Sequence, residues 1–210
     1  MCGITAVRFA LPDTARTSEL EAQLRASIKA MEHRGPDDSG TYVSEDGLVG
    51  LGHARLSIID LSGGHQPLHD EEDIHVVVNG EIYDYATVRK ELEEKGYHFK
   101  SNVDSELVVI LYKIHGQNLV HHLRGEFAFV LYDAKRKLLF GARDRFGIKP
   151  FYYTAVNGSL MIASEMKALI PFGWKAEWDV ESIVHMGDYN DNRTIFKDVY
   201  KAGELIFSSL

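Results

Sequence analysis

Hydrophobic positions in the first part of the chain follow strand spacing in some segments and helix spacing in others. Gly3–Phe9 and Leu48–His53 have the short apolar pattern of strands. Ser18–Glu32 instead carries apolar residues three to four positions apart, as one face of a helix requires. Ser18 and Glu21 have the spacing of a capping box, which predicts that the helix begins at Ser18.

The next segments predict a strand followed by two helices. Ile74–Val78 is a β-branched run that ends at the Asn79-Gly80 pair. The pattern of Asp84–Lys95 predicts a helix that Asp84 caps, and Asp104–His115 predicts another. Asn-Gly is a preferred turn dipeptide, so by itself the pair after the strand favours a hairpin turn.

The second half of the chain changes to short strands separated by turn residues: Phe127–Tyr132, Leu138–Arg143, Phe151–Thr154 and Leu160–Ala163. We expect these strands to form one meandering antiparallel sheet. Strands, then helices, then strands without a regular βαβ repeat predict an α+β layered domain. From about Asp179 the periodicity weakens, so we expect a domain over residues 1–185 and a C-terminal extension over residues 186–210.

Composition narrows the class of protein. A length of 210 residues with 45% hydrophobic content suits one substantial core. The chain has no long uncharged apolar run and no basic segment leading into an apolar one, which predicts a soluble, cytoplasmic protein. A net charge of -8 argues against nucleic acid or an anionic membrane as partner and favours a small-molecule ligand.

The single cysteine, Cys2, follows Met1 directly. Removal of Met1 would give Cys2 both a thiol and a free α-amine, whose pKa of about 7.7–8.0 suits a base near neutral pH. A nucleophile and its base would then share one residue, which is the logic of N-terminal nucleophiles. The alternative is an ordinary buried thiol, which is the better interpretation of Cys2 taken alone. Gly3, which allows close backbone approach, favours the catalytic interpretation only together with further segments of the chain.

Six segments occur in an order that resembles class II glutamine amidotransferases: Met1–Ile4, His33–Gly40, His53–Asp60, Asn79–Tyr83, Ser101–Glu106 and Ala142–Tyr153. Within that class, Pro36-Asp37-Asp38 and the Arg143–Pro150 run are most similar to asparagine synthetase. The resemblance implies an N-terminal-nucleophile hydrolase fold of four layers, αββα, with two mainly antiparallel sheets. The implied reaction is hydrolysis of the glutamine side-chain amide to glutamate and ammonia through a Cys2 thioester.

The resemblance also assigns roles to individual residues. The Asn79 side chain and the Gly80 backbone N–H would stabilise the oxyanion. Arg55 and Asp104 would bind the α-carboxylate and α-ammonium of glutamine, with Glu81 as a second contact to the ammonium. The backbone of Leu56, Ser57, Ile58 and Ile59 would complete the substrate wall, and Arg34 and Gly35 would support the nucleophile. As alternatives, Arg55 would form a surface ion pair and Asp104 would cap the following helix.

No cofactor is expected for the glutaminase reaction. His65 and His69 have helical spacing, but Pro67 between them prevents a helix, so no metal site is predicted. ATP and Mg would belong to a synthetase domain, which we expect this chain to lack because its end departs from the family pattern. A separate synthetase polypeptide or a second copy of the chain is the expected partner, and Arg143–Pro150 is expected to be structural or to form an interface.

Two functional alternatives remain open, as does the acceptor of the ammonia. One is a non-catalytic regulatory or binding module derived from a truncated asparagine synthetase. The other is an N-terminal-nucleophile amidohydrolase that acts on a different amide, against which the opposite charges of Arg55 and Asp104 argue.

Overall fold

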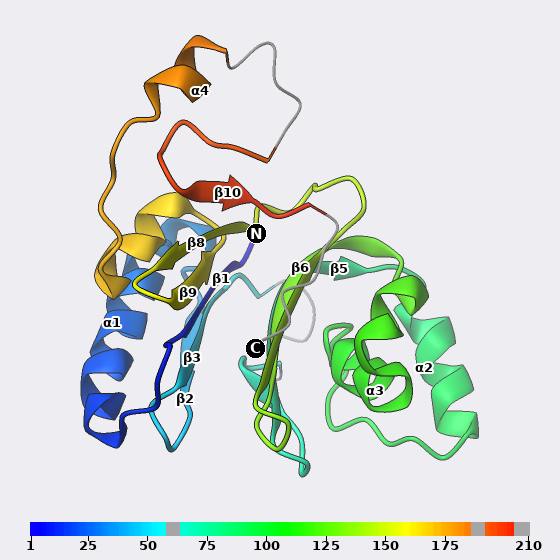
Figure 1. Cartoon of the computed structure of the whole chain (residues 1–210). Coiled ribbons are helices and arrows are strands. Elements are labelled where there is room, and N and C mark those ends of the chain that lie inside the picture. The colour runs from blue at the N-terminus through cyan, green and yellow to red at the C-terminus, as the bar shows by residue number, and fades with distance from the viewer. Residues whose placement is uncertain (58–63, 186–191, 204–210) are drawn as a thin grey trace.

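The computed structural model describes residues 1–57, 64–185 and 192–203, and within these residues two antiparallel sheets face each other (Figure 1). The six-stranded sheet has the order β10-β8-β9-β1-β3-β2. Its strands are β1 (Gly3–Arg8), β2 (Asp38–Val43), β3 (Val49–Arg55), β8 (Tyr152–Val156), β9 (Ser159–Ala163) and β10 (Val199–Lys201). The four-stranded sheet has the order β4-β5-β6-β7, with β4 (Leu68–His69), β5 (Ile74–Ile82), β6 (Gly125–Asp133) and β7 (Leu138–Arg143).

Helices cover the outer face of each sheet, which gives the four layers αββα (Figure 1). The six-stranded sheet packs on α1 (Thr17–Ala30) and the 3-10 helix η4 (Met166–Phe172). The four-stranded sheet packs on α2 (Tyr85–Glu94), α3 (Glu106–His115) and η3 (Gly116–His122). Shorter elements are η1 (Thr14–Arg16), η2 (Glu32–Arg34) and α4 (Val180–Val184). None of the described helices is long and apolar enough to cross a bilayer.

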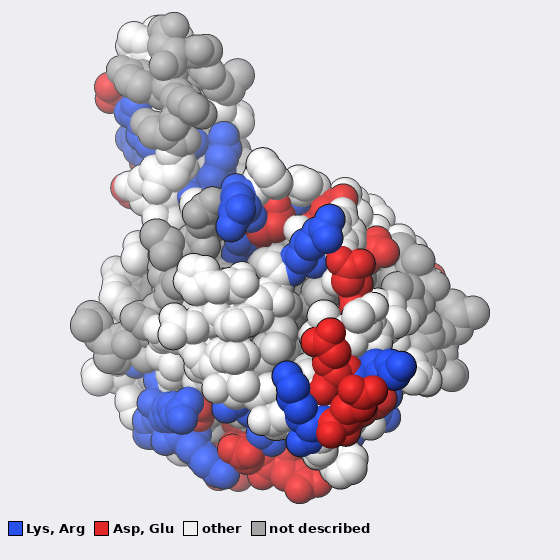
Figure 2. Space-filling model, turned by 90° about the vertical axis from the view of Figure 1, so that its right-hand side faces the viewer, with Lys and Arg blue, Asp and Glu red and all other residues white. Residues whose placement is uncertain are grey.

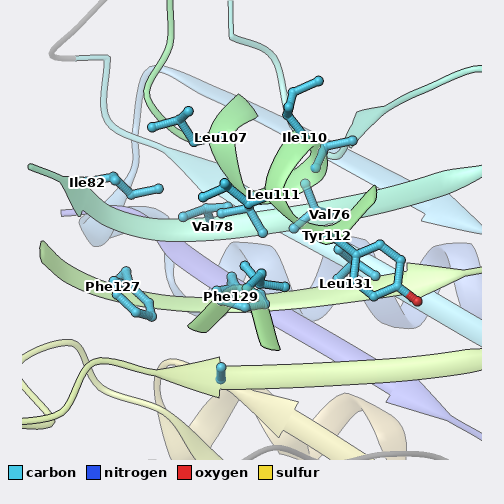
Figure 3. Close-up of a cluster of buried hydrophobic side chains, with 14 of the residues drawn as sticks. Val76, Val78, Ile82, Leu107, Ile110, Leu111, Tyr112, Phe127, Phe129 and Leu131 are labelled. Atoms are coloured by element: carbon cyan, nitrogen blue, oxygen red, sulfur yellow. The ribbon is translucent and has the colours of Figure 1, made fainter. Parts of the chain in front are cut away.

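Both sheets are buried on two faces, and alternate positions along a strand serve different cores. In β5, Val77 belongs to the core between the sheets, whereas Val76 and Val78 pack against the helices. Phe129 and Leu131 of β6 join Val76 and Val78 in the helix-side core (Figure 3). This two-residue period lets a nearly continuous apolar strand hold two layers together.

The strands of the second half do not form the single meander that the sequence predicted. β6 and β7 belong to the four-stranded sheet, and β8 and β9 belong to the six-stranded sheet. The chain therefore crosses between the sheets after β7, which a pattern of local strands cannot reveal. β10 lies within residues 186–210, predicted as an extension, and its pairing with β8 makes it part of the larger sheet.

Two predicted helix caps are wrong. α1 begins at Thr17 because η1 runs directly into it, and Asp13 caps η1 by accepting from Ala15 N at 3.0 Å. Glu21 binds the hydroxyl of Thr41 at 2.8 Å and so makes no capping box with Ser18. Asp84 precedes α2 but has a left-handed backbone, and its carboxylate pairs with Arg124 rather than capping the helix.

The Asn79-Gly80 pair does not form a hairpin turn, because both residues lie inside β5, which continues to Ile82. Asn79 pairs with Ala128 and Gly80 with Phe127 in the ladder to β6. A Cβ atom on residue 80 would lie 2.1 Å from the carbonyl oxygen of Glu126. Glycine is therefore required here for close backbone approach rather than for a turn.

We predict that His53 makes the stability of the protein depend on pH. Burial lowers the pKa of the fully buried His53 from 6.5 to about 4. Between these values the unfolded chain binds a proton that the folded chain does not, so the free energy of unfolding should fall as the pH is lowered through this range. The free energy of unfolding, measured by urea titration, should fall less between about pH 7 and about pH 5 in His53→Gln than in the wild type. Equal losses in the two proteins would contradict this prediction.

Candidate active site

A pocket of about 130 Å³ lies where the start of β1 faces the end of β5. The residues around it come from segments far apart in the sequence, and half of them were predicted for the site: Cys2, Arg55, Leu56, Asn79, Gly80, Glu81 and Asp104. Met1 also lines the pocket. Ser57 lies beside it and donates its backbone N–H to Asp37, whereas Ile58 and Ile59 lie outside the described residues.

The Cys2 thiol is held against the residue that follows β3. Leu56 N–H donates to Sγ at 3.4 Å, and Sγ lies 3.7 Å from the Leu56 carbonyl oxygen. The carbonyl oxygen of Cys2 accepts a hydrogen bond from Arg34 Nε at 2.9 Å. Arg34 in turn pairs with Glu165 at 3.2 Å. The ion pair between Arg34 and Glu165, the residue before η4, therefore fixes the side chain that binds the Cys2 backbone.

Gly35 allows the loop after Arg34 to pack directly on β3. A Cβ on residue 35 would lie 2.3 Å from the carbonyl oxygen of Ala54, a distance that only glycine avoids. The next residues follow the same strand end, where Pro36 forms a parallel bridge with Arg55 and Asp37 N donates to Arg55 O at 3.0 Å. Arg34 and Gly35 therefore contact the backbone of the site without lining the pocket.

Among the described residues, no strand lies beside one edge of β5 at the pocket. The short β4 reaches only Val76 and His75. Tyr83 N–H, just beyond β5, donates to Arg124 on the side of β6. Because the peptide groups of neighbouring residues in a strand point to opposite edges, those of Val78, Gly80 and Ile82 point away from β6. Their backbone groups therefore need partners other than a strand.

Side chains fill this role at two of the three positions. Val78 N–H donates to Gln66 Oε1 at 2.6 Å, and Ile82 N–H donates to Asp104 Oδ2 at 2.6 Å. The Gly80 N–H lies between them at the pocket and has no hydrogen-bond acceptor among the described residues. This arrangement leaves one backbone donor available to a ligand.

The Asn79 side chain is fully buried, yet neither its Nδ2 nor its Oδ1 has a partner among the described residues. An unpaired buried amide is unfavourable by about 1–3 kcal/mol, so such groups are rare unless a ligand or water completes them. Asn79 and Gly80 line the same pocket as the Cys2 thiol. The pocket therefore places unpaired polar groups next to a nucleophile.

Opposite charges line the same pocket. Arg55 is only 6% exposed, which excludes a surface ion pair, and Asp104 is 7% exposed. Burial raises the pKa of the Asp104 carboxyl above its usual range. Asp104 reaches across to Ile82 in β5, whereas α3 begins at Glu106 without a side-chain cap. A buried cation and a buried anion at one pocket suit a zwitterionic ligand.

Several residues of the site were not predicted from the sequence. Gln66 and Lys149 both line the pocket. Lys149 Nζ pairs with Glu126 at 2.8 Å, and Tyr83 donates its hydroxyl to the same carboxylate at 2.7 Å. The Arg143–Pro150 motif was a signal for Lys149, but nothing local marks Gln66 as a partner for the backbone of Val78.

The Arg143–Pro150 segment is a folded loop held by the buried Asp144 and the partly buried Arg143. The Asp144 carboxylate accepts backbone hydrogen bonds from Phe146, Ile148 and Lys149 at 3.0–3.1 Å. The Arg143 guanidinium donates to the carbonyl oxygens of Gly147, Lys149 and Ala202. These bonds direct Lys149 into the pocket while Phe146 remains 85% exposed.

On the face that carries α2 and α3, the charged side chains of the described residues are of both signs (Figure 2). Positive and negative side chains lie beside one another there, around a broad uncharged area (Figure 2). Among the described residues, no group of three or more His, Cys, Asp or Glu is arranged to hold a metal ion.

Comparisons with known proteins agree with this arrangement. The model of a glutamine amidotransferase domain matches residues 1–206. The chain is 45% identical to the amidase chry2 of Gibberella zeae, over 96% of this chain and 31% of that protein. It is 40% identical to asparagine synthetase [glutamine-hydrolyzing] 1 of Bacillus subtilis, over 87% of this chain and 29% of that protein. The chain thus spans less than a third of these relatives.

Solved structures show the same fold. A glutamine phosphoribosylpyrophosphate amidotransferase from B. subtilis, in complex with ADP and GMP, matches with a TM-score of 0.65. The match has 18% sequence identity and covers 82% of this chain and 44% of that chain. The predicted fold class, an N-terminal-nucleophile hydrolase with four αββα layers, is confirmed. The chain belongs to the glutamine amidotransferase domain family, of class II and with asparagine synthetases among its relatives.

We predict that Gly80→Ala destabilises the protein by about 1–3 kcal/mol, because the added methyl group must displace the backbone of β6. The midpoint of urea unfolding measures this loss. Gly203→Ala is the control, since a Cβ there has no heavy atom within 4 Å. If Gly80→Ala is as stable as the control, the close approach of β5 and β6 tolerates a side chain and the prediction is wrong.

Proposed function

We propose that the chain hydrolyses the side-chain amide of glutamine with Cys2 as the nucleophile. The observation that carries this proposal is the fully buried Asn79 amide, which has no partner among the described residues and lines the same pocket as the Cys2 thiol. Family membership supports the same reaction, and the relatives include glutamine-hydrolyzing asparagine synthetases.

In the proposed reaction, removal of Met1 frees the α-amine of Cys2, which accepts the thiol proton. The thiolate attacks the side-chain carbonyl carbon, and the resulting oxyanion accepts hydrogen bonds from Asn79 Nδ2 and Gly80 N–H. Collapse of this intermediate breaks the C–N bond, and the protonated α-amine gives its proton to the departing ammonia. Water then attacks the thioester, which releases glutamate and restores the thiol.

Substrate selection follows from the charges of the pocket. Arg55 binds the α-carboxylate and Asp104 binds the α-ammonium, with Glu81 as a second contact and the Leu56–Ile59 backbone as the wall. Two parallel hydrogen bonds from a guanidinium fit a carboxylate better than a single ammonium donor does. These assignments favour a free amino acid over a peptide or another amide.

The glutaminase steps are complete with the nucleophile, base and oxyanion donors of this chain, and we propose that they need no cofactor. ATP and Mg would serve a synthetase domain, which we propose as the user of the ammonia. Phe146 and Ile148, which are 85% and 51% exposed, support a contact at the Arg143–Pro150 loop. The amidase relatives leave the chemical nature of the acceptor open.

Labelling tests the nucleophile. Protein verified by mass to begin at Cys2 should release ammonia from glutamine and should form an adduct at Cys2 with a γ-electrophilic glutamine analogue. Cys2→Ala should abolish both, and the chain has only one Cys to label. An adduct at another residue would contradict the assignment. Processed protein that binds glutamine without releasing ammonia would favour a non-catalytic binding module.

Asp104→Asn tests recognition of the ammonium. We expect it to raise KM for glutamine by about 30-fold or more, the equivalent of about 2 kcal/mol for a buried charge pair. For the wild type, kcat/KM should fall as acid protonates Asp104, at a pH above the ordinary Asp pKa of about 3.9, because burial raises the pKa of this carboxyl. Asp104→Asn should lack this acidic limb.

Glu106→Gln is the matched control, since Glu106 is a buried carboxylate beside Asp104 that binds backbone N–H groups of Lys100 and Ser101 outside the pocket. Its KM should stay within about twofold of wild type. N-acetylglutamine, which has no ammonium, should be a poor substrate for the wild type. Equal turnover of glutamine and N-acetylglutamine would refute the role of Asp104.

A further inference from the structure

His53 connects the two sheets directly behind the pocket. It lies on β3 of the six-stranded sheet, and its Nε2 lies 3.1 Å from the carbonyl oxygen of Val78 on β5 of the four-stranded sheet. The side chain is fully buried, and its Nδ1 has no partner among the described residues. The proposed reaction does not use this imidazole as a proton carrier.

The contact fixes the chemical form of the ring. A carbonyl oxygen only accepts hydrogen bonds, so Nε2 must carry the hydrogen, and a neutral imidazole then has a bare Nδ1. Burial lowers the pKa of His53 to about 4, which agrees with a neutral ring near pH 7. A neutral ring inside the core acts as a fixed hydrogen-bond donor.

The accepting carbonyl belongs to the peptide unit that joins Val78 to Asn79. Beyond β4, no strand in the described part of the chain pairs with this edge of β5, and Gln66 already binds the Val78 N–H. Among the described residues, His53 is therefore the hydrogen-bond partner of the Val78 carbonyl on this edge. Without it, the peptide before Asn79 would keep a buried, unpaired acceptor and could rotate.

The same residue is tied to the strand of the nucleophile. His53 pairs with Ile4 in the ladder between β3 and β1, two positions along the chain from Cys2. The His53 side chain thus spans from β3, which pairs with the strand that follows the thiol, to β5, which carries Asn79 and Gly80.

We propose that His53 is a positioning residue that holds the oxyanion-stabilising groups of Asn79 and Gly80 in register with the Cys2 thiol. This inference rests on the proposed glutaminase function. Its effect is on the geometry of the transition state, because oxyanion donors act only when placed beforehand where charge develops. Glutamine binding through Arg55 and Asp104 should be independent of it.

His53→Leu and His53→Gln separate positioning from packing. Leucine fills similar space without a donor, and we expect kcat for glutamine hydrolysis to fall by up to about 100-fold with KM within about twofold of wild type. Glutamine can bring an amide N–H to the Val78 carbonyl, so His53→Gln should recover kcat to within about fivefold of wild type. Tyr132→Phe, which removes a polar atom elsewhere in the core between the sheets, should leave kcat unchanged.

Two further measurements distinguish this role from simple loss of fold. The γ-aldehyde analogue of glutamine forms a tetrahedral adduct with a thiol, and its affinity should fall in His53→Leu in parallel with kcat. The rate of Cys2 alkylation by iodoacetamide, which needs no oxyanion donor, should equal that of wild type.

If His53→Leu has the kcat of the wild type, the inference is overturned but the proposed function is not. A loss of kcat that His53→Gln fails to recover has the same consequence. A slower alkylation of Cys2 and a raised KM, together with the lower kcat, would assign His53 to the fold instead. Absence of glutamine hydrolysis by processed wild-type protein would overturn the proposed function, and the inference with it.

Discussion

The structure of the site depends on one unpaired strand edge. A strand buried between two layers must satisfy every backbone group, and β5 does so on one side through β6. On the other side, the short β4 pairs only with His75 and Val76, so Gln66, His53 and Asp104 supply the missing partners. Side chains can be arranged to leave a chosen backbone group uncovered, which a neighbouring strand cannot do. The Gly80 N–H is therefore available because side chains, and not a paired strand, border this edge of β5.

The charges at the pocket depend on the same edge. Asp104 uses one carboxylate oxygen to bind Ile82 N–H, which fixes its position relative to β5 before any ligand enters. Arg55 stands at the end of β3, where the backbone of Asp37 follows the strand. Because both charged groups are held by sheet termini, their separation is set by the packing of the two sheets. Preorganised charges of this kind lose little entropy when a ligand binds.

Local patterns predicted most elements but not how they assemble. Alternation identified β7 with its bounds, Leu138–Arg143, yet the same alternation could not tell that β8 lies in the other sheet. Asn79-Gly80 favours a turn locally, and burial of the flanking apolar positions on both faces outweighs that preference. Polar site residues were found where a motif resembled a known family. Gln66 and His53 had no assigned role because their partners are backbone groups brought near only by the fold.

Arg143 gives the pocket a mechanical link to a distant part of the chain. Its guanidinium is a rigid fork whose donors hold carbonyl groups of Gly147, Lys149 and Ala202. Because the guanidinium is rigid, a displacement at Ala202, next to β10, must either carry the Lys149 carbonyl with it or break a partly buried hydrogen bond. The wall of the pocket that contains Lys149 is therefore coupled in position to residues that lie beyond the last sheet strand.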